Sequence, residues 1–314
     1  MLRFILGFIG AVFSVVLLIS FFGNVSIYLT SPPPPSAEEE FHLHPKPLHL
    51  ASDGLMGKFD NQQLQRGLQV YKEVCSACHS LNQVAFHDLE GIGYNEAEIK
   101  AFAAQFDNIP TVNPETGEPA TRKGLPSDKF PSPYANETAA RAANNNALPP
   151  DLSLMTKARH GGAAYVHSIL TGYKNQAGYK NEKGVELLKE FPTAKTPNGL
   201  HFNPYFANLN LAMPPPLTSE GQVVYAPGNP KPTVDQMATD VSAFLVWTAE
   251  PKLAKRHAAG LWAVLFLLVA TVLGYFAYRN IWYGEKAVVR PTGALEPKNQ
   301  AKARSAKRKA GIDG

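Results

Sequence analysis

Two long apolar runs flank a more polar middle section in this 314-residue chain. The runs cover residues 4–22 and 258–278, and each is close to the roughly 20 residues that a helix needs to cross hydrocarbon. The residues between the runs are rich in turn-forming types, which indicates a folded domain outside the membrane. The pattern therefore predicts two membrane helices attached to one soluble domain.

This pattern divides the chain into five expected parts. Residues 1–30 are an N-terminal membrane segment, 31–59 a linker, 60–257 the folded domain, 258–283 a transmembrane helix, and 284–314 a basic tail. The linker begins with four prolines followed closely by three glutamates. Such a composition is typical of a stiff, polar spacer that lifts a domain off the bilayer.

Helical signals dominate the domain, and no alternating pattern is long enough to predict a sheet. Three helix starts are marked by a capping residue ahead of apolar positions at helical spacing: Asp60, Asn95 and Thr233. Shorter helices are expected over 137–143, from about Asp151, and over 163–170. Segments 107–136 and 172–232 are expected as loops, and loops this long are uncommon unless functional. We therefore expect a mainly α domain whose long loops wrap a large, flat cofactor.

Composition restricts the class of protein. Hydrophobic residues make up 45% of the chain and charged residues 18%, and the mean hydropathy is −0.17. The chain is therefore too polar for a multi-span transporter and too apolar for a disordered protein. The net charge of +4 does not indicate nucleic-acid binding, because much of the basic excess lies in the tail. The only two cysteines lie in one short motif, so no disulfide framework can hold the domain together.

The basic tail also predicts the orientation in the membrane. Lys and Arg clusters beside a membrane helix stay on the cytoplasmic side, and Arg3 precedes the first apolar run. We therefore expect a bacterial inner-membrane protein with both ends in the cytoplasm and its domain in the periplasm, because no Arg/Ser-rich transit peptide is present. The first run exceeds a usual signal-peptide core, which favours a retained helix; a cleaved signal stays an open alternative.

One pentapeptide carries the candidate chemistry: Cys75-Ser76-Ala77-Cys78-His79. Its C-x-x-C-H spacing is typical of c-type haem attachment. Two thiols on one turn can each add to a vinyl group of the porphyrin, and the adjacent imidazole can bind the iron. The alternatives are a redox C-x-x-C pair and half of a zinc site, but zinc usually takes four ligands and no second cysteine pair exists. The motif therefore predicts one covalent haem c.

The second axial ligand determines what such a haem can do. A methionine thioether raises the reduction potential and suits electron transfer, whereas an open position suits gas binding or catalysis. The candidate methionines are Met56, Met155, Met213 and Met237. Met213 precedes three prolines, which bias it towards an extended conformation and can hold its thioether rigidly. The pattern favours Met213 over a histidine such as His160 or His201, with a proline-rich surface loop as the other interpretation.

Six further segments stand in order along the chain: AARAANN (139–145), ALPPDLS (147–153), ARHGG (158–162), LTGY (170–173), FNPYF (202–206) and AEP (249–251). Together with the haem motif they resemble the cytochrome c1 family, the haem subunits of quinol–cytochrome c reductase (the cytochrome bc1 complex). The resemblance extends from about Gln65 to Tyr283. It implies a cytochrome-c-like helical core, with His79 and Met213 as axial ligands of the iron.

The resemblance also implies residues around the haem. Arg159 is expected to pair with a haem propionate, which suits a planar guanidinium, and an ordinary surface ion pair is the alternative. The positions expected to line the pocket are Asn144, Pro149 and Tyr165, with Leu148 and Pro150 beside them. Core packing would explain Tyr165 equally well. The chain departs from the family in its apparently retained first helix, and it cannot carry the extra cysteine pair of some bacterial relatives.

The function implied is the transfer of single electrons in a respiratory complex, with no catalytic acid or base in this chain. A Rieske iron–sulfur subunit would deliver the electron, and a c-type cytochrome would accept it. A cytochrome b subunit and membrane lipid would surround the last helix, in a dimeric complex. The alternatives are a haem subunit of another respiratory enzyme, a free-standing tethered carrier, and a gas sensor in which the ligand displaces Met213.

Overall fold

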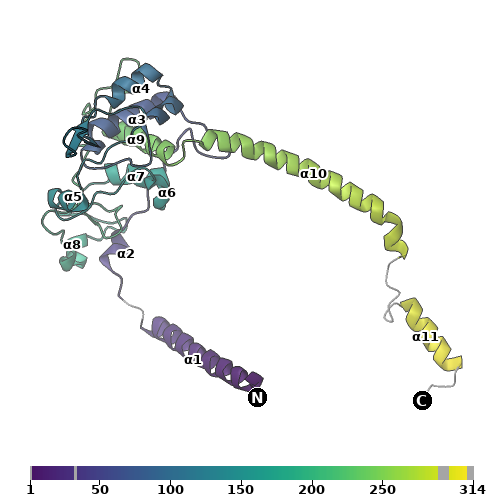
Figure 1. Cartoon of the computed structure of the whole chain (residues 1–314). Helices are drawn as coiled ribbons and strands as arrows, with labels where there is room; N and C mark the ends of the chain where they lie inside the picture. Colours follow the sequence, from purple (N-terminus) through teal and green to yellow (C-terminus); the bar gives the residue numbers. More distant parts are fainter. Residues whose placement is uncertain (1, 32–33, 289–296, 310–314) are drawn as a thin grey trace. The chain divides into compact units, whose positions relative to one another are not determined.

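The computed structural model describes residues 2–31, 34–288 and 297–309, and it confirms the prediction of a mainly helical fold (Figure 1). Parts of the expected linker and basic tail, at 32–33, 289–296 and 310–314, lie outside the described residues. The longer helices are α1 (Leu2–Thr30), α3 (Asn61–Glu73), α4 (Glu96–Ala103), α7 (Gly162–Thr171), α9 (Val234–Ala249), α10 (Leu253–Val288) and α11 (Pro297–Lys309). The short ones are α2 (Ala37–Phe41), α5 (Glu137–Ala143), α6 (Met155–Ala158) and α8 (Leu187–Glu190), with 3₁₀ turns at Cys75–Ala77, Phe86–Ile92 and Pro192–Ala194.

The described residues form two compact units. The main unit contains the residues up to 53 and those from 58 to 251, and the α10 unit contains Gly54–Gly57 and the residues from 252. In the main unit α9 packs against both α3 and α7 (Figure 1). At the crossing of α3 and α9, a Cβ at Gly67 would overlap the carbonyl oxygen of Asp240, so the close approach requires glycine.

A buried polar cluster stabilises the same helix crossing. The Asp240 carboxylate is fully buried and accepts hydrogen bonds from Arg66 Nε at 2.9 Å and Nη2 at 3.1 Å. The Tyr225 hydroxyl and the Gln236 side-chain amide also donate to it, each at 2.9 Å. Four donor groups thereby satisfy the buried carboxylate. The cluster therefore fixes α3, which leads directly into the cysteine motif, against α9.

The predicted helix starts are confirmed at Asp60, Asn95 and Thr233, because each side chain accepts a hydrogen bond from the first turn. The helix expected from about Asp151 begins four residues later than predicted, because α6 starts at Met155. The Asp151 carboxylate instead accepts hydrogen bonds from Ser80 Oγ at 2.9 Å and from the Ser153 amide at 3.0 Å. These bonds form an Asx turn at residues 151–153 and tie it to Ser80, ahead of the helix.

The prediction of loops without strands was wrong in two places. Strands β1 (Ile109–Val112) and β2 (Pro119–Arg122) form an antiparallel hairpin, and β3 (His201–Phe202) pairs with β4 (Asn210–Leu211). Strands of two to four residues are too short for an alternating pattern to be recognised. The helix α8 also interrupts the second expected loop.

The expected spacer contains a folded element, the helix α2, which begins at Ala37 and packs within the main unit. Ser36 and Glu39 form a capping box at the start of α2, so one of the three glutamates serves the helix start. Phe41 at the end of α2 is fully buried, in a second core cluster with Leu187 and Phe202. Tertiary burial of one aromatic side chain therefore overrides the spacer-like composition.

Two helices are long and apolar enough to cross a membrane. They are α1 and the first 31 residues of α10, up to Tyr283, and no residue in the most apolar stretch of either is buried. The α10 helix starts five residues before the expected position 258 and runs five beyond 283. The helix therefore includes polar residues before and after its apolar stretch.

Candidate functional site

The C-x-x-C-H motif folds as a tight turn directly after α3. The amides of Cys78 and His79 both donate to the Cys75 carbonyl oxygen, at 3.1 and 2.9 Å. The Tyr71 hydroxyl, from the last turn of α3, donates to the His79 carbonyl oxygen at 2.9 Å. The motif is therefore closed on itself and tied back to the helix that delivers it.

Both cysteines are free thiols and half-buried. Burial, with a smaller contribution from neighbouring Cys78, raises the pKa of the Cys75 thiol to about 12. No group of three or more His, Cys, Asp or Glu side chains that could hold a metal occurs in the described part of the chain. The zinc alternative therefore gains no support, whereas two free thiols on one turn fit double attachment to a porphyrin.

The imidazole of His79 is oriented by a backbone carbonyl. Its Nδ1 lies 2.8 Å from the carbonyl oxygen of Pro150. Because a carbonyl only accepts, Nδ1 must carry the proton, which leaves a lone pair on Nε2. Nε2 has no hydrogen-bond partner within the described residues. Burial lowers the pKa of His79, although the hydrogen bond to Pro150 opposes this shift, so the ring is neutral at neutral pH. A neutral imidazole with a free Nε2 fits an iron ligand.

The loop that supplies this carbonyl is fastened to the motif from both sides. The Asp151 carboxylate accepts from the Asn82 amide at 2.7 Å, and the Leu152 amide donates to the Ser80 carbonyl oxygen at 2.9 Å. Residues 150–152 therefore run alongside residues 79–82. Pro150, whose position the resemblance had marked only as pocket lining, acts here through its backbone.

The four candidate methionines differ in their surroundings. Met237 is fully buried in the main core, as its helical face predicted, and Met56 is 66% exposed in the α10 unit. Met155 and Met213 are both half-buried and pack against the main core, which Cys75 also contacts. The structure therefore brings Met213 to the same core cluster as the cysteine motif, but Met155 shares that property.

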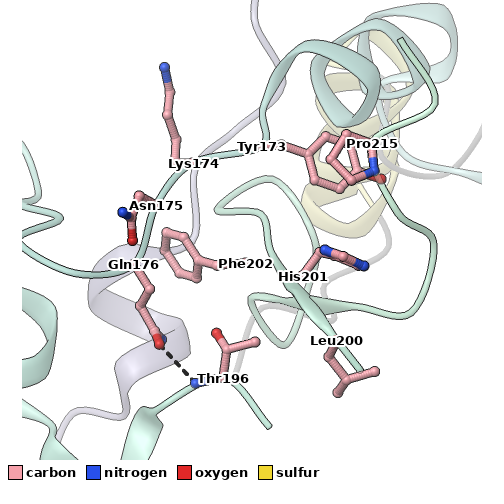
Figure 2. Close-up of a pocket in the computed structure, with 9 residues that line it drawn as sticks. All are labelled: Tyr173, Lys174, Asn175, Gln176, Thr196, Leu200, His201, Phe202 and Pro215. Carbon is pink, nitrogen blue, oxygen red and sulfur yellow. Dashed lines mark hydrogen bonds between the residues drawn. The ribbon is translucent and has the colours of Figure 1, made fainter. Parts of the chain in front are cut away.

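Met213 has one contact that Met155 lacks. The Tyr173 hydroxyl donates to the Met213 carbonyl oxygen at 3.0 Å, which ties the methionine segment to the end of α7. Tyr173 lines a hollow of about 420 Å³ with His201 and Pro215 (Figure 2). The rings of Tyr173 and His201 are 6.5 Å apart in an edge-to-face arrangement. The His201 ring therefore packs at the wall of this hollow, and Pro215, two residues after Met213, lies on the same wall.

The remaining predicted residues lie in different settings. Arg159, just after α6, is exposed; its carbonyl oxygen accepts from the Gly162 amide at 3.1 Å, but its guanidinium makes no hydrogen bond or ion pair with the described residues. Tyr165 on α7 is half-buried; burial raises its pKa, and the charge of Arg159 opposes that rise. Pro149 is half-buried. Asn144 uses its side-chain amide on the Tyr134 hydroxyl at 2.9 Å and the Ala140 carbonyl at 2.7 Å.

Sequence reasoning did not assign roles to the Pro150 carbonyl, to Asp151 or to Tyr173. A carbonyl acceptor leaves no signal in residue identity, because every residue has one. Tyr173 stands in the LTGY segment and Asp151 in ALPPDLS, so the resemblance marked both segments without naming a contact. Only the three-dimensional arrangement assigns these contacts.

Comparison with known proteins points in one direction. A model of the Cytochrome C1 family matches residues 50–285, which include every residue predicted for the haem site. The chain is 42% identical to cytochrome c1 of Rhodospirillum rubrum over 238 residues, 73% of this chain and 84% of the relative. It is 42% identical over 248 residues to the mitochondrial haem protein cytochrome c1 1 of Arabidopsis thaliana, covering 78% and 75%. It is 41% identical over 245 residues to the mitochondrial cytochrome b-c1 complex catalytic subunit of Candida albicans, covering 77% and 79%.

Proposed function

Since the chain belongs to the cytochrome c1 family, a group of haem c proteins, we propose that it is the electron-transfer subunit of a respiratory quinol–cytochrome c reductase. In this role it accepts one electron from a Rieske iron–sulfur subunit and passes it to a c-type cytochrome. The observation that carries the proposal is at His79. Its Nδ1 is committed to the Pro150 carbonyl, so Nε2 is left as a neutral ligand atom beside the two cysteines.

We assign His79 and Met213 as the axial ligands of the haem that Cys75 and Cys78 hold. When bound, haem c supplies a one-electron iron couple. The lowered pKa of His79 keeps its ring available to a metal at neutral pH. The hydrogen bond from Tyr173 restrains the backbone of Met213. A thioether ligand favours a high reduction potential, which suits an electron carrier.

The other predicted residues receive roles that follow from their settings. The Arg159 guanidinium is assigned to a haem propionate, because it is exposed and has no partner among the described side chains. Asn144 is assigned a supporting role, since its amide already donates to Tyr134 and Ala140. Pro149 and Tyr165 are assigned to the apolar pocket wall. None of these residues acts as a catalytic acid or base.

The complex is proposed to contain a cytochrome b subunit beside α10, a Rieske subunit and a second copy of each chain. The name of the Candida albicans relative, a cytochrome b-c1 complex subunit, supports this setting. We place the chain in a bacterial inner membrane, with the main unit in the periplasm and the C-terminus in the cytoplasm. The support is the basic composition of α11, which follows the apolar α10 and contains no acidic residue.

The test is a matched pair of methionine variants in the purified complex. Met213→Leu and Met155→Leu each replace a half-buried methionine that packs against the same core, and Leu conserves volume closely. We expect Met213→Leu to lower the haem reduction potential, to admit carbon monoxide to the reduced haem, and to slow quinol-driven cytochrome c reduction. Met155→Leu is expected to leave all three measurements unchanged.

Two results would contradict the proposal. If Met213→Leu leaves the reduction potential unchanged, Met213 is not the iron ligand. The same conclusion follows if only Met155→Leu lowers the potential. Ready carbon monoxide binding by the unmodified protein would instead indicate an open site and a gas-binding function. Subunits that co-purify in mild detergent identify the complex, and we expect a cytochrome b and a Rieske protein. Co-purification of a terminal oxidase instead of these two subunits would overturn the assignment to the reductase.

A further inference from the structure

A short turn in the α10 unit presents two large apolar side chains to the surroundings. Gly54–Gly57 closes with a hydrogen bond from the Gly57 amide to the Gly54 carbonyl oxygen, and Gly54 adopts a φ of +79°. Between these glycines, Leu55 is 90% exposed and Met56 is 66% exposed. Adjacent apolar side chains this exposed at a turn tip indicate an apolar partner.

The turn is attached to the membrane helix rather than free in solution. His257 Nδ1 lies 3.2 Å from the Gly57 carbonyl oxygen, and both residues belong to the α10 unit. Leu253, one helical turn before His257 on the same face, is buried. His257 directly precedes the apolar stretch that starts at residue 258. The turn is therefore held at the level where α10 changes from polar to apolar.

The position of the turn along the membrane normal follows from the aromatic residues of α10. Tryptophans concentrate at membrane interfaces, and Trp262 and Trp282 are twenty residues apart, which at a rise of about 1.5 Å per residue is about 30 Å. That distance equals the thickness of a hydrocarbon core. His257 lies five residues outside Trp262, or about 7.5 Å. The headgroup layer on each side is about 5–7 Å thick, so His257 and the turn bonded to it lie at the outer edge of that layer.

The charges around the turn fit the same location. Lys252 directly precedes α10 and Lys255 lies on its first turn, and both are exposed. Lysines at helix ends extend towards lipid phosphates. An apolar pair with basic neighbours matches the headgroup–acyl boundary, which is polar on one side and apolar on the other.

We propose that Leu55 and Met56 insert into the lipid interface beside the start of α10, as a membrane contact in addition to the apolar helices. The partner is the bilayer itself rather than another subunit. This inference rests on the proposed membrane crossing by α10, and the experiment below separates the two.

The test uses the full, haem-loaded chain in lipid nanodiscs. The chain has only two cysteines, both committed to haem, so each introduced cysteine takes a nitroxide label at a unique site. Leu55→Cys and Met56→Cys label the turn, and Leu268→Cys labels the middle of α10. Val224→Cys is the matched control, since Val224 is 75% exposed but belongs to the main unit. Collision of each label with oxygen, which prefers lipid, is compared with collision with a water-soluble nickel chelate.

We expect the oxygen-to-nickel collision ratio at 55 and 56 to be several-fold higher than at 224 and lower than at 268. Nitroxide-quenching lipids should also broaden the signals at 55 and 56. A ratio at 55 and 56 equal to that at 224, with 268 still in lipid, would overturn the inference and leave the membrane crossing intact. A water-like ratio at 268 would instead refute the membrane crossing. Shielding of 55 and 56 from oxygen, nickel and lipid alike would indicate a protein contact and overturn the inference.

Discussion

The hydroxyl of Tyr173 is expected to hold Met213 on the haem iron, and Tyr173→Phe removes that hydroxyl while keeping the ring. The hydroxyl donates to the Met213 carbonyl oxygen at 3.0 Å. Burial raises the pKa of Tyr173, so the phenol stays protonated and remains a donor throughout the neutral range. The ring itself forms a wall of the hollow with His201 and Pro215 (Figure 2). The substitution therefore removes one donor, whose main bond is to Met213 and which also lies 3.5 Å from the Pro214 carbonyl oxygen, and little packing.

The size of the effect follows from that single bond. A hydrogen bond of this kind contributes about 0.5–1.5 kcal/mol net. Because about 1.4 kcal/mol corresponds to a tenfold change in an equilibrium, the ratio of Met213-bound to Met213-free haem should fall by a factor of about 2 to 13. Since the carbonyl and the thioether belong to the same residue, most of this loss should appear at the iron.

The assay is the charge-transfer absorption band that oxidised haem shows only with a sulfur ligand. Tyr173→Phe should make this band disappear at a lower temperature or urea concentration, and should speed carbon monoxide binding to the reduced protein. The control is Tyr179→Phe, a half-buried tyrosine whose hydroxyl makes no hydrogen bond within the described residues. It should leave both measurements unchanged.

Two outcomes would refute this reasoning. If Tyr173→Phe and Tyr179→Phe lose the sulfur band at the same temperature, the hydroxyl does not restrain the ligand. If Tyr173→Phe lowers the unfolding temperature of the whole domain while the band persists until unfolding, the bond stabilises the fold without positioning the methionine.

Three further predictions concern stability of the haem-loaded chain. Asp240→Ala should lower the free energy of unfolding by about 3–5 kcal/mol, because it leaves the Arg66 guanidinium buried without its carboxylate; a change below 1 kcal/mol in urea titrations would contradict this. Gly67→Ala should destabilise by at least about 1–3 kcal/mol, because its Cβ meets backbone rather than a flexible side chain, and a wild-type melting temperature would show that the helices separate freely. Burial lowers the pKa of His167, so the unfolded chain binds a proton that the folded chain resists, and stability should fall as the pH drops below about 6.5. His167→Gln should flatten this slope in melts at several pH values, whereas the exposed His87→Gln should keep it.

Much of the fold is encoded in patterns only a few residues long. A capping side chain bonds an amide two or three residues away, so the helix starts at Asp60, Asn95 and Thr233 can be recognised locally. Apolar runs and their flanking charges likewise depend on composition alone, and they predicted α1 and α10. The short strands were not predicted, because a two-residue strand such as His201–Phe202 is stabilised by its pairing partner rather than by a pattern of its own.

The sequence by itself determined the chemistry of attachment, because C-x-x-C-H places two thiols and an imidazole on one turn whatever the rest of the chain does. Only the tertiary structure decided which atom of His79 is available, through a carbonyl 71 residues away at Pro150. It also decided what restrains Met213, through a hydroxyl 40 residues away at Tyr173. Hydrogen bonds between distant residues leave no periodic trace, since any of many polar groups could serve until the chain is folded.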